Sequence, residues 1–298
     1  MDKESKEIIS ILLLIFLPII LFFASFLLGR YPIAPFDVIN TLLCPIFPQC
    51  EVSPTITTIV FEIRLPRILG AFVVGSSLAM AGVAFQSIFK NPLVSSDLLG
   101  VSNGAGFGAA LAILISGVGV VTQIFAFIFG IISVSITYML SKAYKSGGIL
   151  VLVLSGVAIS AFFSALVSAI KFVADPNDKL PEIVYWLMGS LASVTVDKLI
   201  MILVPVALGM IILFALRWNM NLLAMGDEEA QSLGINPSRV RLLIIIGCTL
   251  LTSAAVSISG IIGWIGLVIP HMARMVVGSD NRILIPASLS LGASFLLL

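Results

Sequence analysis

Few residues in this 298-residue chain are of types that catalyse reactions, and they do not form a catalytic constellation. The single histidine, His271, stands in Pro-His-Met-Ala-Arg, and no H-E-x-x-H motif occurs. No lysine follows a glycine, so the phosphate-binding loop G-x-x-x-x-G-K-[ST] is absent as well. We therefore expect no enzymatic activity, no metal site and no cofactor. His271 is interpreted as a polar residue near a helix end.

An acidic segment between two apolar runs has the pattern of a short helix. Asp227, Glu228 and Glu229 suit the positive N-terminal end of a helix, and Gly234 suits its C-terminal cap. Asn236 can cap the next helix, with Pro237 at its first position. A helix of two turns is too short to be stable alone. It either packs on the protein's own inner surface or is presented as a rigid knuckle to a cytoplasmic partner.

Two rows of small and hydroxyl residues recur every four positions, which places each row on one helix face. The first row is Gly156, Ser160, Ser164 and Ser168, and the second is Thr249, Ser253 and Ser257. Such rows could line a passage for a large polar solute or let helices pack closely, and the residues alone favour packing. The glycine-rich stretch 100–110 is predicted to be a close-packed or a broken segment.

The three cysteines fall in two settings. Cys44 and Cys50 flank a segment with two prolines and could close a small disulfide ring on an oxidising face, or remain unbridged. Cys248 lies in an apolar run and is interpreted as a packed thiol.

The elements that carry these residues must lie in a lipid bilayer. Hydrophobic residues make up 59% of the chain and charged residues 10%, whereas a soluble domain carries about a quarter charged residues. The mean hydropathy is +1.19 and the net charge is +1. This composition excludes water-soluble enzymes, nucleic-acid binders and disordered regulators, and a charge of +1 gives no reason to expect a polyanionic partner.

We predict an all-α, multi-pass membrane protein that forms a single domain over 1–298. Nine apolar runs are long enough to be read as spans, near 8–29, 68–89, 98–116, 120–140, 148–172, 199–216, 242–258, 261–277 and 283–298. No Asp, Glu, Lys or Arg stands near the centre of any span. This weakens the alternative of a stand-alone, ion-coupled secondary transporter, although a carrier that binds sodium through backbone carbonyls remains open.

The arrangement of basic residues predicts a cytoplasmic N-terminus. With that orientation ten of the 16 Lys and Arg residues fall on the inside, in agreement with the positive-inside rule. The segment 30–62 is then the longest outer loop. The last run ends at Leu298 without a polar anchor, so we expect the sequence to lack a final C-terminal helix.

Three blocks of sequence together resemble the FecCD family, the membrane subunits of type II ABC importers, which include the vitamin B12 permease. The blocks are Arg64-Leu-Pro-Arg67 with the small residues that follow it up to Asn91-Pro-Leu93, then Asp97-Leu-Leu-Gly-Val-Ser-Asn-Gly-Ala105, and finally the acidic segment with Gly260-Ile-Ile-Gly-Trp-Ile-Gly-Leu-Val-Ile-Pro-His-Met-Ala-Arg274. The resemblance covers most of the chain from Arg64 onward.

The resemblance implies a ten-helix permease that forms a homodimer in the cell membrane, binds two ATP-binding subunits inside and receives its solute from an extracytoplasmic binding protein. The solutes of the family are iron-siderophore complexes, haem, cobalamin and sometimes oxyanions. By the same resemblance, Arg64 and Arg67 contact acidic residues of the binding protein, though an anchor pair at the membrane interface is the alternative. The segment Gly226, Asp227, Glu228, Glu229, Ala230, Gln231, Ser232, Leu233 and Gly234 becomes the coupling helix for the ATPase.

The resemblance also implies that Gly156, Ser160, Ser164 and Ser168 border the translocation path at the dimer axis, which places lining above packing for this row. The sequence departs from the family by ending before an outer A-D-x-x-A-R block and the tenth span. Besides the secondary transporter, a membrane scaffold or receptor without transport is the remaining rival.

Overall fold

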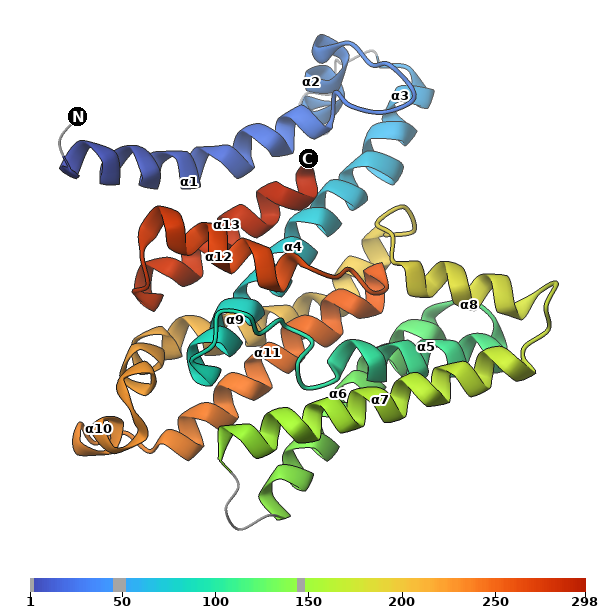
Figure 1. Ribbon diagram of the computed structural model, residues 1–298. Helices are drawn as coiled ribbons and strands as arrows, with labels where there is room; N and C mark the ends of the chain where they lie inside the picture. Colours follow the sequence, from blue (N-terminus) through green and yellow to red (C-terminus); the bar gives the residue numbers. More distant parts are fainter. Residues whose placement is uncertain (1–2, 45–51, 144–147) are drawn as a thin grey trace.

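The computed structural model describes residues 3–44, 52–143 and 148–298, with the side chains of residues 3–11 left out. Within these ranges the regular structure is entirely helical (Figure 1). The elements are α1 (Lys3–Ser25), α2 (Pro35–Leu43), α3 (Pro54–Thr58), the π-helix η1 (Ile59–Arg64), α4 (Leu65–Phe89), α5 (Val101–Ser116), α6 (Val120–Ala143), α7 (Ile149–Val173), α8 (Lys179–Met188), α9 (Val196–Met225), α10 (Asp227–Ser232), α11 (Pro237–Ser259), α12 (Ile265–Val277) and α13 (Asn281–Leu297).

Each of the nine predicted spans coincides with a helix, but the helices differ in length. Five helical segments in the described ranges are long and apolar enough to cross a membrane, namely 54–89, 120–143, 149–173, 196–225 and 237–259. The apolar parts of α1, α5, α12 and α13 are shorter, between 10 and 17 residues. The structure is therefore that of a multi-pass membrane protein, and the count of nine spans stays a prediction.

Two segments that we expected to be loops contain helices. The outer segment 30–62 holds α2, α3 and most of η1, and α8 lies between α7 and α9. α2 and α3 both begin with proline, at Pro35 and Pro54, a residue suited to the first helical turn. These helices are too short to give a strong periodic pattern, which is why apolar periodicity did not reveal them.

Helix α4 lies at the centre of the bundle, with α9, α11, α12 and α13 packed around it (Figure 1). Glycines let two neighbours approach it closely. A Cβ atom on Gly75 would lie 2.1 Å from the carbonyl oxygen of Gly292 in α13, and one on Gly82 would lie 2.0 Å from that of Gly266 in α12. Backbone therefore packs on backbone, as in small-residue interfaces between membrane helices.

The glycine-rich stretch 100–110 is a close-packed helix and not a broken one. It forms the first part of α5, which packs along α6. Cβ atoms on Gly104 and Gly108 would lie 2.6 Å and 2.4 Å from the carbonyl oxygens of Phe129 and Phe125. The glycines thus set the distance between α5 and α6, and this packing offsets their weak helix propensity.

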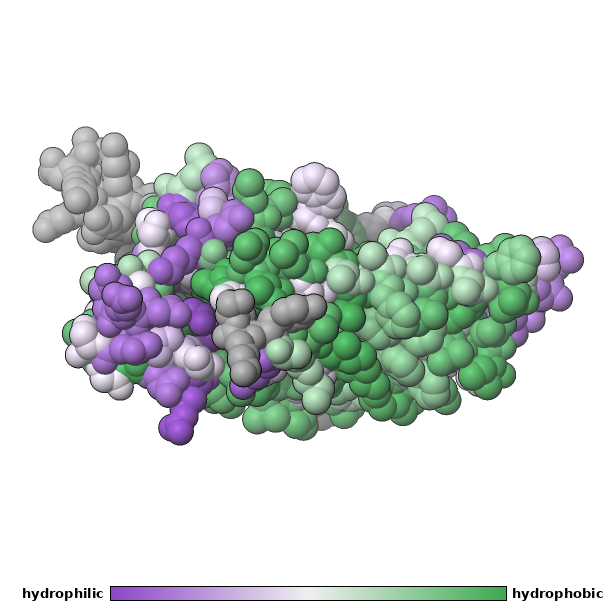
Figure 2. All heavy atoms as spheres, turned by 60° about the horizontal axis from the view of Figure 1, so that its bottom comes forward, coloured by the Kyte–Doolittle hydropathy of each residue, from purple (hydrophilic) through white to green (hydrophobic). Residues whose placement is uncertain are grey.

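The outermost helices expose apolar side chains. Only 22% of the most apolar window of α7, and likewise of α9, is buried within the chain. Figure 2 shows a largely hydrophobic surface, with hydrophilic residues gathered at the end of the molecule where α10 lies. A surface of this kind is covered by lipid or by another protein chain.

Candidate functional site: the acidic helix and its supports

The acidic segment forms α10, as the sequence predicted. Its C-terminus has both hydrogen bonds of a Schellman motif, from Ile235 N to Ala230 O (3.0 Å) and from Gly234 N to Gln231 O (2.9 Å). Gly234 supplies the left-handed conformation at φ +81°. Asn236 then caps α11 by accepting a hydrogen bond from Arg239 N (3.1 Å). The chain therefore turns sharply from α10 into α11.

Two contacts fix α10 to the rest of the molecule. Ala230 is fully buried, and the Asp227 carboxylate forms an ion pair with Arg241 of α11, with Nη2 at 2.8 Å from Oδ1 and 3.2 Å from Oδ2. The opposite face of the helix is exposed, including the Glu228 and Glu229 side chains. Leu233 next to them is 58% exposed. α10 thus presents two exposed acidic side chains and an apolar side chain on a braced support.

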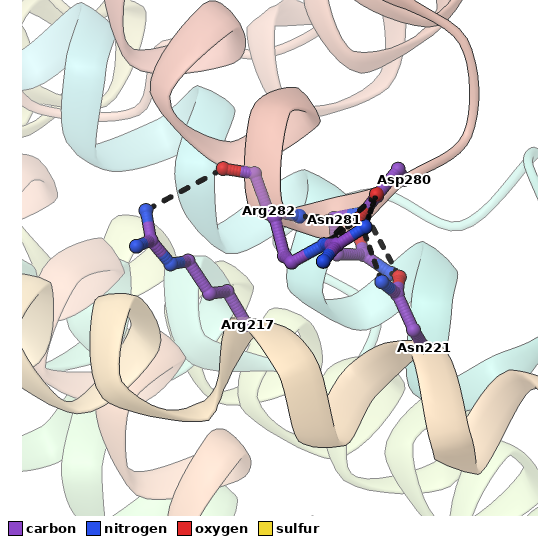
Figure 3. A network of polar contacts seen from close by, with 5 residues as sticks. All are labelled: Arg217, Asn221, Asp280, Asn281 and Arg282. Atoms are coloured by element: carbon purple, nitrogen blue, oxygen red, sulfur yellow. Dashed lines mark hydrogen bonds and ion pairs between the residues drawn. The ribbon is translucent and has the colours of Figure 1, made fainter.

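A polar clamp holds the end of α9, from which α10 emerges, against the start of α13 (Figure 3). Asn221 Nδ2 donates to Asp280 Oδ1 (2.7 Å), while Asn221 Oδ1 accepts from Asn281 N (2.9 Å) and Nδ2 (2.8 Å). Arg282 forms an ion pair with Asp280 at 2.6 Å. These hydrogen bonds, from Arg282 first and Asn221 second, hold the pKa of the Asp280 carboxyl well below its usual range.

The clamp also reaches the central helix, because Ser87 of α4 donates to Asn281 Oδ1 at 2.8 Å. α4, α9 and α13 are therefore linked at the end of the molecule that carries α10. The segment from which α10 emerges is thus joined to α4 and α13 by hydrogen bonds. Sequence reasoning missed this clamp, since its partners are about 60 and 194 residues apart in the chain.

The serine row on α7 changes from packed to exposed along the helix. A Cβ atom on Gly156 would lie 2.4 Å from the carbonyl oxygen of Leu98, so this end packs on the turn before α5. Ser160 is half-buried, and Ser164 and Ser168 are exposed. Ser168 donates to the carbonyl oxygen of Ser164 at 3.1 Å. Two hydroxyls of the row therefore lie on a surface that no described part of this chain covers.

The row on α11 is buried instead. Thr249 and Ser257 donate to backbone carbonyls of their own helix, at 2.7 Å and 2.8 Å. Ser253 packs against Gly130 of α6, where an added Cβ would lie 2.6 Å from its hydroxyl oxygen. Packing is the role of this second row.

The two arginines of the R-L-P-R block have different environments. Arg67 is exposed, but Arg64 is only 8% exposed, and its guanidinium donates to the carbonyl oxygens of Phe26 and Tyr31. Of the two arginines predicted to contact the binding protein, only Arg67 is therefore exposed. Arg30, Arg64 and Arg67 line a surface cavity of about 550 Å³ between the end of α1 and the start of α4.

A serine with a partly buried carboxylate beside it lies at the start of α5. Gly100-Val-Ser102-Asn-Gly104 matches the hydrolase pattern G-x-S-x-G, but no strand precedes it here and the Ser102 hydroxyl donates to Asp97. Burial raises the pKa of the Asp97 carboxyl, and the hydrogen bond from Ser102 opposes that shift. The serine hydroxyl is therefore bound to the turn before α5 and has no histidine partner among the hydrogen bonds of the described residues.

The remaining candidate residues form no site in the described ranges. His271 is exposed on α12, and no group of three His, Cys, Asp or Glu side chains there could hold a metal ion. Cys248 is fully buried with its thiol 3.7 Å from Ala81 O, which confirms it as a packed residue. Cys50 lies outside the described residues, so its bridge to Cys44 stays a prediction.

Comparison with known proteins identifies relatives over nearly the whole chain. A model of the FecCD transport family matches residues 15–298. The molybdate import system permease protein of Haemophilus influenzae is 38% identical over 100% of this chain and 87% of its own length. A probable iron chelatin transport system permease protein of Helicobacter pylori is 46% identical, over 85% of this chain and 76% of its own. The hemin transport system permease protein of Yersinia pestis is 35% identical, over 80% and 72%.

A solved structure has the same fold. It is described as a metal-chelate type ABC transporter in an inward-facing conformation, and it superposes with a TM-score of 0.83 at 36% sequence identity. The superposition covers 95% of this chain and 86% of that chain.

Proposed function

Because this chain belongs to the FecCD transport family, we propose that it forms the translocation path for a metal-chelate type solute, such as an iron-siderophore complex, haem or cobalamin. The chain is the permease subunit of an ABC importer, and ATP hydrolysis is done by a separate ATPase. The named relatives import molybdate, an iron chelate and hemin, so family membership alone does not select the solute. The metal-chelate class rests on the similarity to the solved transporter.

We further propose that nine helices cross the membrane, namely α1, α4, α5, α6, α7, α9, α11, α12 and α13, with the N-terminus in the cytoplasm. With these crossings, six helices would separate the N-terminus from α10, and both would lie on the same side of the membrane. The segment that holds Arg30 and Arg67 follows one crossing and faces outward. The excess of basic residues on the α10 side supports this orientation.

On the inner side, α10 serves as the coupling helix that docks on the ATPase. The observation that carries this proposal is a short helix whose acidic residues Glu228 and Glu229 are exposed, while its other face is braced by Ala230 and Arg241. ATP binding and hydrolysis would shift the permease between outward- and inward-facing states through differential contacts with α10. The clamp at Asn221 would carry the displacement to α4 and α13.

On the outer side, Arg67 is the better candidate for docking the binding protein. It is exposed and can pair with a carboxylate, whereas both terminal nitrogens of Arg64 are already bound to backbone carbonyls. We assign Arg64 a supporting role, in which it shapes the cavity beside Arg67.

The exposed apolar face of α7 supports a homodimer in which two copies of this helix enclose the solute path. Ser164 and Ser168 would then line that path with hydroxyls that carry no charge to trap the solute. Gly156 and Ser160, which pack on the turn before α5, would lie at its rim.

The test of α10 is charge reversal. In the complex with its ATPase, Glu228→Lys and Glu229→Lys together should leave membrane insertion intact and reduce ATPase co-purification and ATP-driven uptake. Asp178→Lys, at an exposed acidic residue just before α8 at the opposite end of the molecule, is the matched control and should retain both. Normal uptake by the double variant would refute the coupling role. A secondary transporter would take up solute from an ion gradient without the ATPase.

A further inference from the structure

A groove runs between α6 and α11 along the membrane-facing part of the bundle. Its apolar section has a volume of about 140 Å³ and is lined by Ile131, Val134 and Tyr138 of α6 with Leu242, Ile245 and Leu250 of α11. These positions recur every three to five residues on each helix, so they form one continuous face of each. α6 and α11 contact one another beneath the groove.

A polar cavity between α6, α7 and α11 adjoins the groove at Tyr138, at the end that carries α10. This cavity has a volume of about 90 Å³, and Tyr138 lines both sections. Its other polar residues are Ser141 and Lys142, one turn further along α6, and Ser238 and Arg241, one turn earlier on α11. The two sections therefore place a polar cavity next to an apolar groove.

The polar cavity carries more positive than negative charge. Lys142 is exposed, with its Nζ 4.9 Å from the centre of the Tyr138 ring. Arg241 uses Nη2 for the ion pair with Asp227, but its Nε atom is buried and has no hydrogen-bond partner in the described part of the chain. Because Nε is enclosed by protein atoms, a ligand in the cavity would contact Arg241 through the rest of its guanidinium, whose positive charge favours oxygen acceptors.

We propose that this groove binds an anionic phospholipid from the leaflet next to α10. The phosphate contacts the Arg241 guanidinium and the Lys142 ammonium, and an acyl chain lies between α6 and α11. The rise from Ser238 to Leu250 is about 18 Å at 1.5 Å per residue, which matches a headgroup plus half of the roughly 30 Å hydrocarbon core. Basic pockets between membrane helices on the cytoplasmic side are known to suit such headgroups.

The charges distinguish this ligand from two others. A free phosphate ion would satisfy Arg241 but leave the apolar section empty. A phosphatidylcholine would bring a quaternary ammonium, which donates no hydrogen bond, close to Lys142. An anionic lipid fits both sections, and it would hold Arg241 between a phosphate and Asp227. The bound lipid would thereby stabilise the position of α10 relative to α11.

Binding can be measured on the full chain, purified in detergent and delipidated, by titrating the thermal unfolding midpoint. We expect dioleoylphosphatidylglycerol to raise the midpoint, and dioleoylphosphatidylcholine and inorganic phosphate to have little effect. Lys142→Gln removes one positive charge that would contact the headgroup. It should weaken the apparent affinity for phosphatidylglycerol about fivefold, the effect of one basic residue near a lipid surface. Ser135→Trp places a bulky ring in the apolar section and should abolish the shift. Arg239→Gln, on α11 outside the groove, is the matched control.

Three results would overturn the proposal. If phosphatidylcholine stabilised the protein as much as phosphatidylglycerol, the groove would bind acyl chains without selecting the headgroup. If inorganic phosphate did so, the site would bind an anion and not a lipid. An affinity for phosphatidylglycerol that is the same in Lys142→Gln, Ser135→Trp and the unaltered chain would place the lipid elsewhere. The lipid proposal rests on the proposed function only where it calls the leaflet cytoplasmic. The binding assay contains no ATPase, so a negative result would not bear on the coupling role of α10.

Discussion

Arg64 offers a sharp test of how the outer end of the permease is built. Its guanidinium joins α4 to the carbonyl oxygens of Phe26 and Tyr31, on either side of the turn at Gly29. A Cβ atom on Gly29 would lie 2.8 Å from Arg64 Nη2, so this turn is shaped around the guanidinium. Hydrogen bonds that involve a charged group contribute about 1.5 kcal/mol or more each. Arg64→Ala should therefore lower the free energy of local opening by about 3 kcal/mol, twice that contribution.

Amide hydrogen exchange measures this local opening directly. About 3 kcal/mol corresponds to a roughly 100-fold faster exchange of the peptides that cover Phe26 to Leu43, while peptides from the buried centre of α4 stay protected. Arg67→Ala is the matched control, since Arg67 is exposed one helical turn away, and it should leave exchange unchanged but weaken binding-protein docking. Unchanged hydrogen exchange in Arg64→Ala would refute the supporting role of Arg64. It would instead favour the hypothesis that Arg64 contacts the binding protein directly.

Two further predictions concern packing and pH. Gly75→Ala places a methyl group against the Gly292 carbonyl and should destabilise the protein by about 1–3 kcal/mol, measured by thermal unfolding. Gly119→Ala is the control and should be neutral, because no heavy atom lies within 4 Å of the added methyl group. Equal unfolding midpoints for the two variants would contradict the close packing of α4 on α13. Asp280→Asn should lower the unfolding midpoint at pH 7, because the depressed pKa of Asp280 stabilises the fold above the unfolded value of about 3.9. This difference should shrink as the pH falls below about 4, and a difference that is constant down to pH 3 would contradict the clamp.

Much of the helical framework was predictable because it depends on local signals. Apolar runs marked the positions of the long helices, and the capping residues Gly234 and Asn236 marked both ends of the turn after α10. The buried thiol of Cys248 followed from its apolar neighbours alone. In each case the determining residues lie within a few positions of one another, so their pattern is visible in the sequence.

Features made by distant residues could not be predicted. Nothing near Arg64 in the sequence indicates that its partners are backbone carbonyls of the turn after α1, 33 and 38 residues earlier. The clamp between Asn221 and Asn281 and the ion pair between Asp227 and Arg241 likewise depend on how helices pack. The two hydroxyl rows have the same spacing, yet the row on α7 becomes exposed along its helix while the row on α11 is buried. The difference depends on how α7 and α11 pack in the bundle, which the spacing does not reveal.

Uptake into vesicles tests most directly whether this chain depends on an ATPase that acts through α10. The permease is reconstituted with its ATPase and binding protein, and accumulation of solute is measured with ATP, without ATP and without the ATPase. We predict accumulation only when ATP and the ATPase are both present, and its loss in the Glu228→Lys and Glu229→Lys double variant. Accumulation by the permease alone, driven by an ion gradient, would contradict the account.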